Sequence, residues 1–128
     1  MAGADLYVFE LNDRDAFKQY FEQTAVFDAL REHYVGDESR FEVPTDAWDA
    51  VADTLRDHGY EPTLVDDPEP FCVVIGQYEK HAEILKESVA NWTRREHRFF
   101  LLRSPFAVEQ AVERGATPVA ETEFEAGI

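Results

Sequence analysis

The sequence is poor in lysine, cysteine and glycine, and each shortage narrows what the protein can do. Its 128 residues include only three lysines, one cysteine and six glycines. No two glycines are adjacent, so there is no glycine-rich loop of the kind that cradles phosphate groups. The single cysteine, Cys72, excludes an intrachain disulfide and is typical of a protein in a reducing compartment.

Long hydrophobic runs are also missing. No apolar stretch approaches the roughly 20 residues that a membrane-spanning helix needs. The amino terminus, Met-Ala-Gly-Ala-Asp-Leu, lacks the basic and apolar regions of a signal peptide. We therefore expect a cytoplasmic protein that makes no contact with a membrane.

What the chain has in excess is negative charge. Aspartate and glutamate number 27 against 12 lysines and arginines, which gives a formal net charge of −15. Such an excess destabilises a compact chain by self-repulsion unless salt screens it. Ten phenylalanines, five tyrosines and two tryptophans nevertheless supply ample core material, so the chain is expected to fold.

This composition, acidic and richer in arginine than in lysine, resembles that of small proteins of haloarchaea, whose cytoplasm accumulates salt. The resemblance extends over the whole chain and carries no functional motif. It implies adaptation to a salty interior and leaves the activity open.

The alternation of short apolar runs with amphipathic segments predicts a single α/β domain over residues 1–128, with α+β as the alternative. We expect a mixed sheet of four to five strands flanked by helices. Strands are predicted at 6–11, 40–43, 60–65, 71–75 and 98–103, with an edge strand at 117–124. The acidic turn at 66–70 leaves open whether its flanking strands form a hairpin.

Helices are predicted at 13–34, with a break near Thr24, and at 45–58, 78–92 and 105–114. Thr45 and Ser104 precede two of them as caps, and Asn12 and Asp13 precede the first. The segment 71–103 has the order of a right-handed βαβ unit. Arg40-Phe41 before the Thr45 helix and Arg98-Phe99 before the Ser104 helix are weakly similar. We do not infer an internal duplication from this similarity.

No pattern of catalytic residues stands out. The four histidines are scattered without metal-ligand spacing, and the abundant carboxylates single out no acid and base pair. The sequence therefore predicts no catalytic residue, no metal site and no cofactor.

The most informative feature is a basic segment, residues 80–103, which carries half of the chain's basic residues. Trp92 and His97 lie between its arginines and could stack on a base. The candidate residues of this segment for binding an anion or a partner are Lys80, Lys86, Trp92, Arg94, Arg95, Arg98 and Arg103. The alternative is that these cations form ion pairs within an acidic protein and that Trp92 belongs to the core.

A second candidate site follows from topology alone. Ligands of open α/β sheets lie beyond the carboxyl ends of the strands, and polar residues follow several predicted strands. The candidates for this strand-end site are Asn12, Thr45, Gln77 and Ser104.

Three functions are consistent with these observations. The first is a non-enzymatic binding or interaction protein that forms a homodimer, or contacts a protein partner, through the helix at 78–92. The second is a nucleic-acid-binding regulator that uses the basic segment. The third is an enzyme with a small-anion site at the strand ends, for which no reaction can be named.

Overall fold

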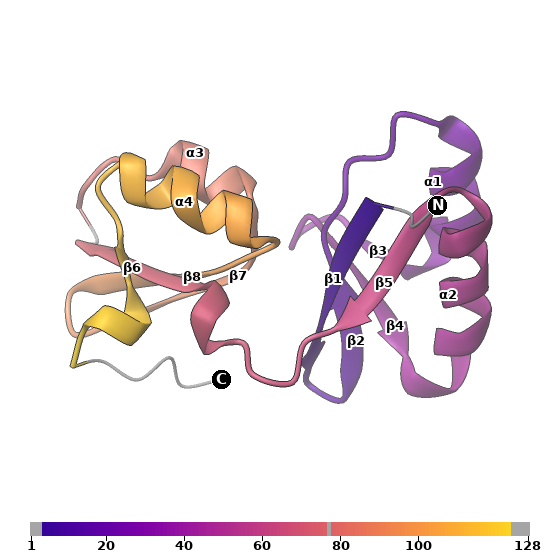
Figure 1. Cartoon of the computed structure of the whole chain (residues 1–128), viewed down its shortest axis with the longest axis horizontal. Coiled ribbons are helices and arrows are strands. Elements are labelled where there is room, and N and C mark those ends of the chain that lie inside the picture. Colours follow the sequence, from indigo (N-terminus) through magenta and orange to yellow (C-terminus); the bar gives the residue numbers. More distant parts are fainter. Residues whose placement is uncertain (1–3, 77, 124–128) are drawn as a thin grey trace. The chain divides into compact units, whose positions relative to one another are not determined.

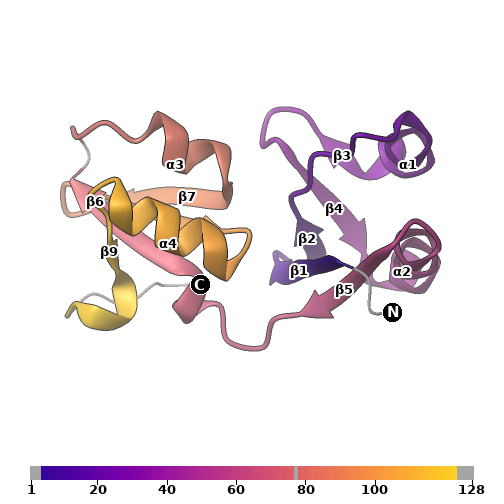
Figure 2. The same cartoon turned by 45° about the horizontal axis from the view of Figure 1, so that its top comes forward.

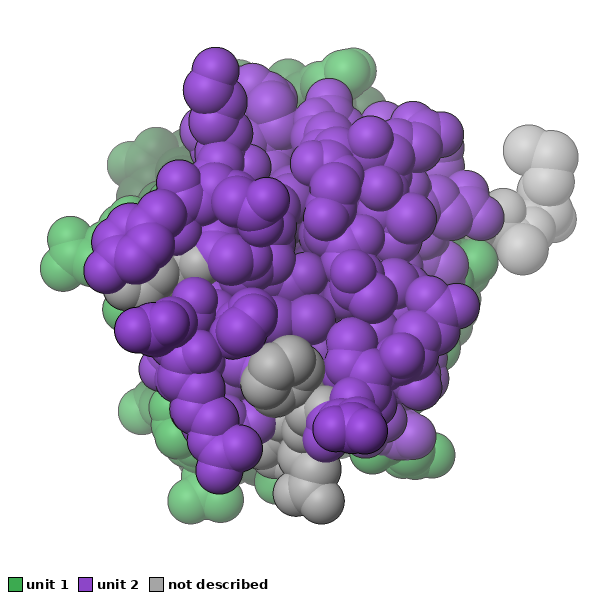
Figure 3. Space-filling view, turned by 90° about the vertical axis from the view of Figure 1, so that its left-hand side faces the viewer, with its two compact units in different colours: residues 1–66 green, residues 67–128 purple. Residues whose placement is uncertain are grey.

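The computed structural model describes residues 4–76 and 78–123. The chain divides into two compact units, residues 1–66 and residues 67–128, which Figure 3 distinguishes by colour. Each unit has its own sheet with helices on one face (Figure 1). Whether the two units form the single domain predicted from the sequence depends on how they combine, so that prediction stays a prediction.

Unit 1 is built on a mixed five-stranded sheet in the order β3-β4-β2-β1-β5. The strand β1 pairs in parallel with β5 and antiparallel with β2. The elements are β1 (Ala4–Leu11), β2 (Arg14–Phe17), α1 (Thr24–Leu30), β3 (Tyr34–Val35), β4 (Arg40–Pro44), α2 (Trp48–Asp57) and β5 (Tyr60–Leu64). The strands predicted at 6–11, 40–43 and 60–65 and the helix at 45–58 are thereby confirmed.

The helix predicted from residue 13 is wrong over its first part. Asn12 and Asp13 have φ values of 52° and 65° and form the two-residue turn between β1 and β2, as a type I′ hairpin requires. Asparagine and aspartate tolerate this left-handed backbone, so their signal belongs to a turn and not to a helix cap. The α-helical part is limited to α1, Thr24–Leu30; a 3-10 turn follows at Arg31–His33, and Tyr34 belongs to β3.

An aromatic cluster fills the core of unit 1 between the sheet and its helices. Phe41 on β4 is at its centre: it stacks on Phe17 with a centroid distance of 5.0 Å and receives the edges of Phe21, Phe27 and Tyr34. The aliphatic part of the same core consists of Leu6, Val8, Val26, Leu30, Val43, Val51 and Leu55.

Unit 2 is a four-stranded sheet in the order β7-β8-β6-β9, and every pair in it is antiparallel. Its elements are β6 (Cys72–Gly76), α3 (Ala82–Lys86), β7 (Ser88–Arg94), β8 (His97–Leu102), α4 (Pro105–Glu113) and β9 (Thr117–Pro118). Both helices lie on one face of this sheet (Figures 1 and 2). There they bury Val73, Ile75, Ile84, Phe100, Leu102, Ala107 and Ala111.

The helix predicted at 78–92 is wrong. Only five of its residues are helical, as α3, and Ser88–Arg94 form β7. The apparent apolar stripe does not face one side: Ile84 and Val89 are buried, whereas Tyr78 is 90% exposed and Leu85 is 40% exposed. The run Val89-Ala90-Asn91-Trp92-Thr93 contains β-branched and aromatic residues, which favour a strand.

Because the helix at 78–92 is wrong, the βαβ unit predicted at 71–103 is wrong as well. The strands at both its ends exist, as β6 and β8, but they are antiparallel because the chain reverses at the turn between β7 and β8. Continuous apolar runs such as Phe71–Ile75 therefore do not identify a parallel sheet here. The predicted class, α/β or α+β, is confirmed, and the antiparallel second sheet favours α+β.

The structure also answers one question that the sequence left open and corrects one smaller prediction. The strands on either side of residues 66–70 do not form a hairpin, since β5 and β6 belong to different sheets. The edge strand predicted at 117–124 is limited to the two residues of β9, followed by a 3-10 turn at Val119–Glu121, and Phe124 lies outside the described residues. Within residues 4–76 and 78–123, no helix is long and apolar enough to cross a membrane.

Candidate functional site

The structure divides the basic segment into three parts. Lys86 and Arg103 form ion pairs within the protein: the Lys86 ammonium lies 3.1 Å from Glu83, and the half-buried Arg103 guanidinium pairs with Glu87. These two residues therefore form ion pairs within the protein, which was the alternative to binding an anion or a partner.

The second part is the hairpin of β7 and β8. Trp92 stacks on Phe99 with a centroid distance of 5.7 Å, so one face of its indole ring is covered. The Arg94 guanidinium lies 5.1 Å from the centroid of the same phenylalanine ring, and the Arg98 guanidinium donates a hydrogen bond of 2.8 Å to Asn91. Arg95 is exposed at the tip. Arg94 and Arg95 are exposed, Trp92 and Arg98 are half-buried, and all four lie on a strand pair and not on a helix.

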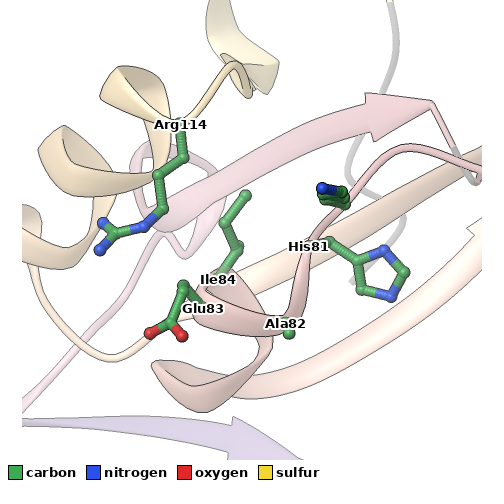
Figure 4. Close-up of a pocket in the computed structure, with 6 residues that line it drawn as sticks. His81, Ala82, Glu83, Ile84 and Arg114 are labelled. Atoms are coloured by element: carbon green, nitrogen blue, oxygen red, sulfur yellow. The ribbon is translucent and has the colours of Figure 1, made fainter.

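The third part is Lys80, which lines a cavity of about 350 Å³ in unit 2. We call this cavity the α3 pocket; its lining residues are Lys80, His81, Ala82, Glu83, Ile84 and Arg114. Figure 4 shows the side chains of Arg114 and Glu83 on one side of Ile84 and His81 on the other. The pocket combines an apolar floor with basic side chains from two separate helix ends.

The strand-end site does not assemble as predicted. The strands β6 and β8 are antiparallel, so their carboxyl ends lie at opposite edges of the sheet, and Ser104 is not brought to the end of β6. Ser104 instead caps α4 by accepting a hydrogen bond of 3.1 Å from the backbone N–H of Ala107. Asn12 is part of the hairpin turn, Thr45 donates a hydrogen bond of 3.4 Å to the carbonyl oxygen of Asp13, and Gln77 lies outside the described residues.

The position of His81 is fixed by two contacts. Its Nδ1 lies 2.8 Å from the carbonyl oxygen of Glu79, and because a carbonyl only accepts, Nδ1 carries the proton. The ring packs on Phe100 of β8 with a centroid distance of 5.7 Å. In the neutral ring Nε2 is then an acceptor, and protonation turns it into a second donor.

Arg114 is the residue that sequence reasoning missed. Its backbone N–H donates to the carbonyls of Gln110 and Ala111 at the end of α4, and Gly115 follows with a φ of 102°. A glycine in this left-handed conformation is the usual helix terminator, and it fixes where Arg114 leaves the helix. Arg114 is 34 residues from Lys80 in the sequence, and only the packing of α4 against α3 joins the two.

The two cations of the α3 pocket differ from most basic residues of the chain. Within the described part of the chain, neither Lys80 nor Arg114 has an ion pair or a side-chain hydrogen bond, and both are exposed. Glu83, the one carboxylate of the lining, is paired with Lys86. The pocket therefore offers two available positive charges next to a buried isoleucine, Ile84, which is 3% exposed.

Comparisons of the chain with protein-family models, curated proteins and solved structures found no match. The arrangement of the side chains alone therefore supports the function proposed below.

Other reactive side chains form no second site in the described part of the chain. No three histidine, cysteine, aspartate or glutamate residues there are grouped so that they could hold a metal ion. Burial, with smaller contributions from Glu69 and Asp67, raises the pKa of the Cys72 thiol to about 12. Cys72 is therefore a buried, protonated thiol whose Sγ lies 3.4 Å from the carbonyl oxygen of Pro68.

Proposed function

We propose that the protein is a non-enzymatic binding protein whose α3 pocket takes a small organic anion with an apolar part. The observation that carries this proposal is the pair of exposed cations, Lys80 and Arg114, beside the apolar floor of a cavity of about 350 Å³. Pockets for small molecules have volumes of roughly 300–1,000 Å³ and combine apolar walls with a few polar groups.

Four of the six lining residues have a role in this proposal. The planar guanidinium of Arg114 can donate two parallel hydrogen bonds to a carboxylate or phosphate, and the Lys80 ammonium adds a second positive charge. Ile84 provides the contact for the apolar part of the ligand. His81, held by its contacts with Glu79 and Phe100, forms part of the pocket wall.

The charge of the whole chain supports a local site. With a formal net charge of −15, most of the surface carries carboxylates, so an anion finds favourable contacts only where cations are concentrated. We infer that the ligand is small, because a polyanion would also meet the acidic remainder of the chain. We infer further that the protein works in the cytoplasm, where the free thiol of Cys72 stays reduced, and at high salt.

Calorimetric titration with three probes tests this function: phenyl phosphate, inorganic phosphate and benzyl alcohol. We expect phenyl phosphate to bind most tightly, because it alone uses both the cations and the apolar floor. Replacing either cation by glutamine, Arg114→Gln or Lys80→Gln, should weaken phenyl phosphate binding about tenfold, the usual effect of losing one charged hydrogen bond.

Arg95→Gln is the matched control, since it removes the same charge from the hairpin tip, outside the pocket. Equal binding by wild type, Lys80→Gln and Arg114→Gln would overturn the proposal. Tight binding of a single-stranded oligonucleotide that is lost in Arg95→Gln and retained in Arg114→Gln would favour the nucleic-acid-binding alternative, with the hairpin as its site.

A further inference from the structure

The sheet edges of the two units are not protected equally. The edge strands β3 and β9 have two residues each, and the edge strand β5 carries Pro62 at its centre. Short edges and prolines are the usual means of preventing a further strand from pairing. The edge strand β7 has seven residues and no proline, and its register shift lies at Ser88 and Ala90, away from the hairpin tip. Residues 90–94 of β7 are therefore the longest regularly paired edge without a proline in the described sheets.

The turn between β7 and β8 determines which backbone groups of β7 face outward. Arg95 and Glu96 have φ values of 53° and 64° and form a two-residue turn of type I′. Such a turn makes Arg94 and His97 a hydrogen-bonded pair, after which bonded and non-bonded pairs alternate. Thr93 opposite Arg98 and Asn91 opposite Phe100 are then non-bonded pairs. The backbone N–H and C=O groups of Asn91 and Thr93 therefore point away from β8, and both residues are exposed.

We propose that β7 pairs antiparallel with β7 of a second copy of this chain, about a two-fold axis at Trp92. This register places Asn91 of each copy opposite Thr93 of the other, so that the outward groups of both strands bond to each other. The two Trp92 residues become a non-bonded pair, in which side chains approach most closely. A second copy fits because, in this register, each outward-facing residue of one strand lies opposite an outward-facing residue of the other.

Charge selects the antiparallel direction. The hairpin tip carries Arg94, Arg95 and Glu96, with a net charge of +1, and the residue before β7 is Glu87, whose carboxylate pairs with Arg103. Antiparallel pairing places the two basic tips at opposite ends of the paired strands. Parallel pairing would place the two basic tips together, which is unfavourable. This edge replaces the helix predicted at 78–92 as the surface for self-association, and it is independent of the α3 pocket.

Sedimentation of the full chain over a range of concentrations tests the proposal with the variants Thr93→Pro and Thr93→Val. Proline at residue 93 removes an N–H that points away from β8, so it blocks the second copy and leaves the hairpin bonds intact. Valine keeps that N–H and the β-branched shape. We expect wild type and Thr93→Val to pass from monomer to dimer as concentration rises, and Thr93→Pro to stay monomeric with an unchanged circular dichroism spectrum.

Amide hydrogen exchange of the wild-type protein gives a second readout that does not depend on the folding of any variant. Exchange at Asn91 and Thr93 should slow about tenfold or more between dilute and concentrated solution, while the exposed turn amide of Asp13 should not change. A wild-type protein that stays monomeric up to millimolar concentration would overturn the proposal. So would a folded Thr93→Pro variant that dimerises like wild type, or a dimer that protects amides elsewhere and not at Asn91 and Thr93.

Discussion

Asp15 and Glu10 face each other across β1 and β2, in adjacent strands of an acidic protein. Partial burial of the Asp15 carboxylate and, second, the charge of Glu10 raise the pKa of Asp15 above its usual value of 3.8. A carboxyl whose pKa is higher in the folded than in the unfolded state binds its proton more tightly when folded. Its ionised form therefore destabilises the fold at neutral pH, and this cost disappears as the pH falls below the unfolded value.

Asp15→Asn should accordingly raise the melting temperature at pH 7, by about 2 °C, since it removes the partly buried charge. The difference from wild type should shrink as the pH is lowered toward 4. Asp5→Asn, on the exposed part of β1, is the matched control for the loss of one negative charge. Thermal unfolding followed by circular dichroism at several pH values measures both. Equal gains from the two variants would show that net charge, and not the surroundings of Asp15, is responsible.

Cys72 is the second residue in an unusual setting. With its thiol pKa raised to about 12 by burial, the reactive thiolate is only about one part in 10⁴ at pH 8. Alkylation by iodoacetamide at pH 8 should therefore be about 1,000-fold slower in the native protein than in denaturant, as mass spectrometry can follow. Modification of the native protein at the rate of a free thiol would contradict the burial of Cys72.

At the residue scale, the sequence predicted part of the candidate site. Lys80 was found because it begins a basic segment in an acidic chain. Arg114 was missed because its local signals, the end of an amphipathic run and a following Gly115, describe a helix terminus and nothing else. Lys86 and Arg103 have the same composition signal as Lys80, but their carboxylate partners are visible only in the structure.

At the scale of elements, the helix caps show most clearly where the same sequence pattern leads to two different structures. Thr45 and Ser104 were both predicted as caps from the same pattern, a hydroxyl residue before an amphipathic run. Ser104 accepts a hydrogen bond from the N–H of Ala107, whereas a 3-10 turn at Thr45–Ala47 precedes α2 and no side chain caps it. The extra turn moves Thr45 away from the first turn of α2.

Ser104→Ala should lower the free energy of unfolding by about 1 kcal/mol, the usual cost of losing a side-chain cap. Thr45→Ala should lower it by less than about 0.5 kcal/mol, as for a surface substitution, since only its hydrogen bond to Asp13 is lost. Urea denaturation of the two variants provides the comparison. A larger loss in Thr45→Ala than in Ser104→Ala would contradict the described caps.

The two units also share an order of elements. Unit 2 runs β6-α3-β7-β8-α4-β9, and β2-α1-β3-β4-α2-β5 of unit 1 has the same sequence of strands and helices. The sheet orders correspond as well, except that β1 is inserted between β2 and β5. The similarity between Arg40-Phe41 and Arg98-Phe99 falls on β4 and β8, which are equivalent in this comparison.

Elements that follow a strong local pattern were predictable, and those decided by turns were not. The helix α2 has both an inner apolar stripe and a terminating Gly59, and it was predicted correctly. The regions 13–34 and 78–92 were misjudged because helical spacing of apolar residues was weighed above turn chemistry and β-branched composition. In both regions a type I′ turn lies next to the error, at Asn12-Asp13 and at Arg95-Glu96.

At the scale of the whole molecule, the excess of negative charge is the feature that most affects the stability of the fold. A formal charge of −15 on 128 residues destabilises any compact state through repulsion, and ions reduce it by screening. The screening length falls from roughly 30 Å at 0.01 M to roughly 3 Å at 1 M salt. The melting temperature should therefore rise substantially over this range of KCl.

Choline chloride provides the control, because screening depends on ionic strength and not on the identity of the cation. Differential scanning calorimetry in the two salts should give parallel curves. A melting temperature independent of salt would mean that repulsion is not limiting, and a rise in KCl alone would indicate specific binding of potassium.

The proposed function depends on one local concentration of positive charge, the α3 pocket. The most direct test is to assign the amide resonances of the full chain and titrate it with phenyl phosphate at constant ionic strength. We predict saturable shifts at the amides of residues 80–84 and 114–115, with the side-chain resonances of Ile84 and His81 moving with the same affinity. Saturable shifts centred on residues 92–98, or no saturable shift anywhere, would contradict the assignment of this pocket as an anion-binding site.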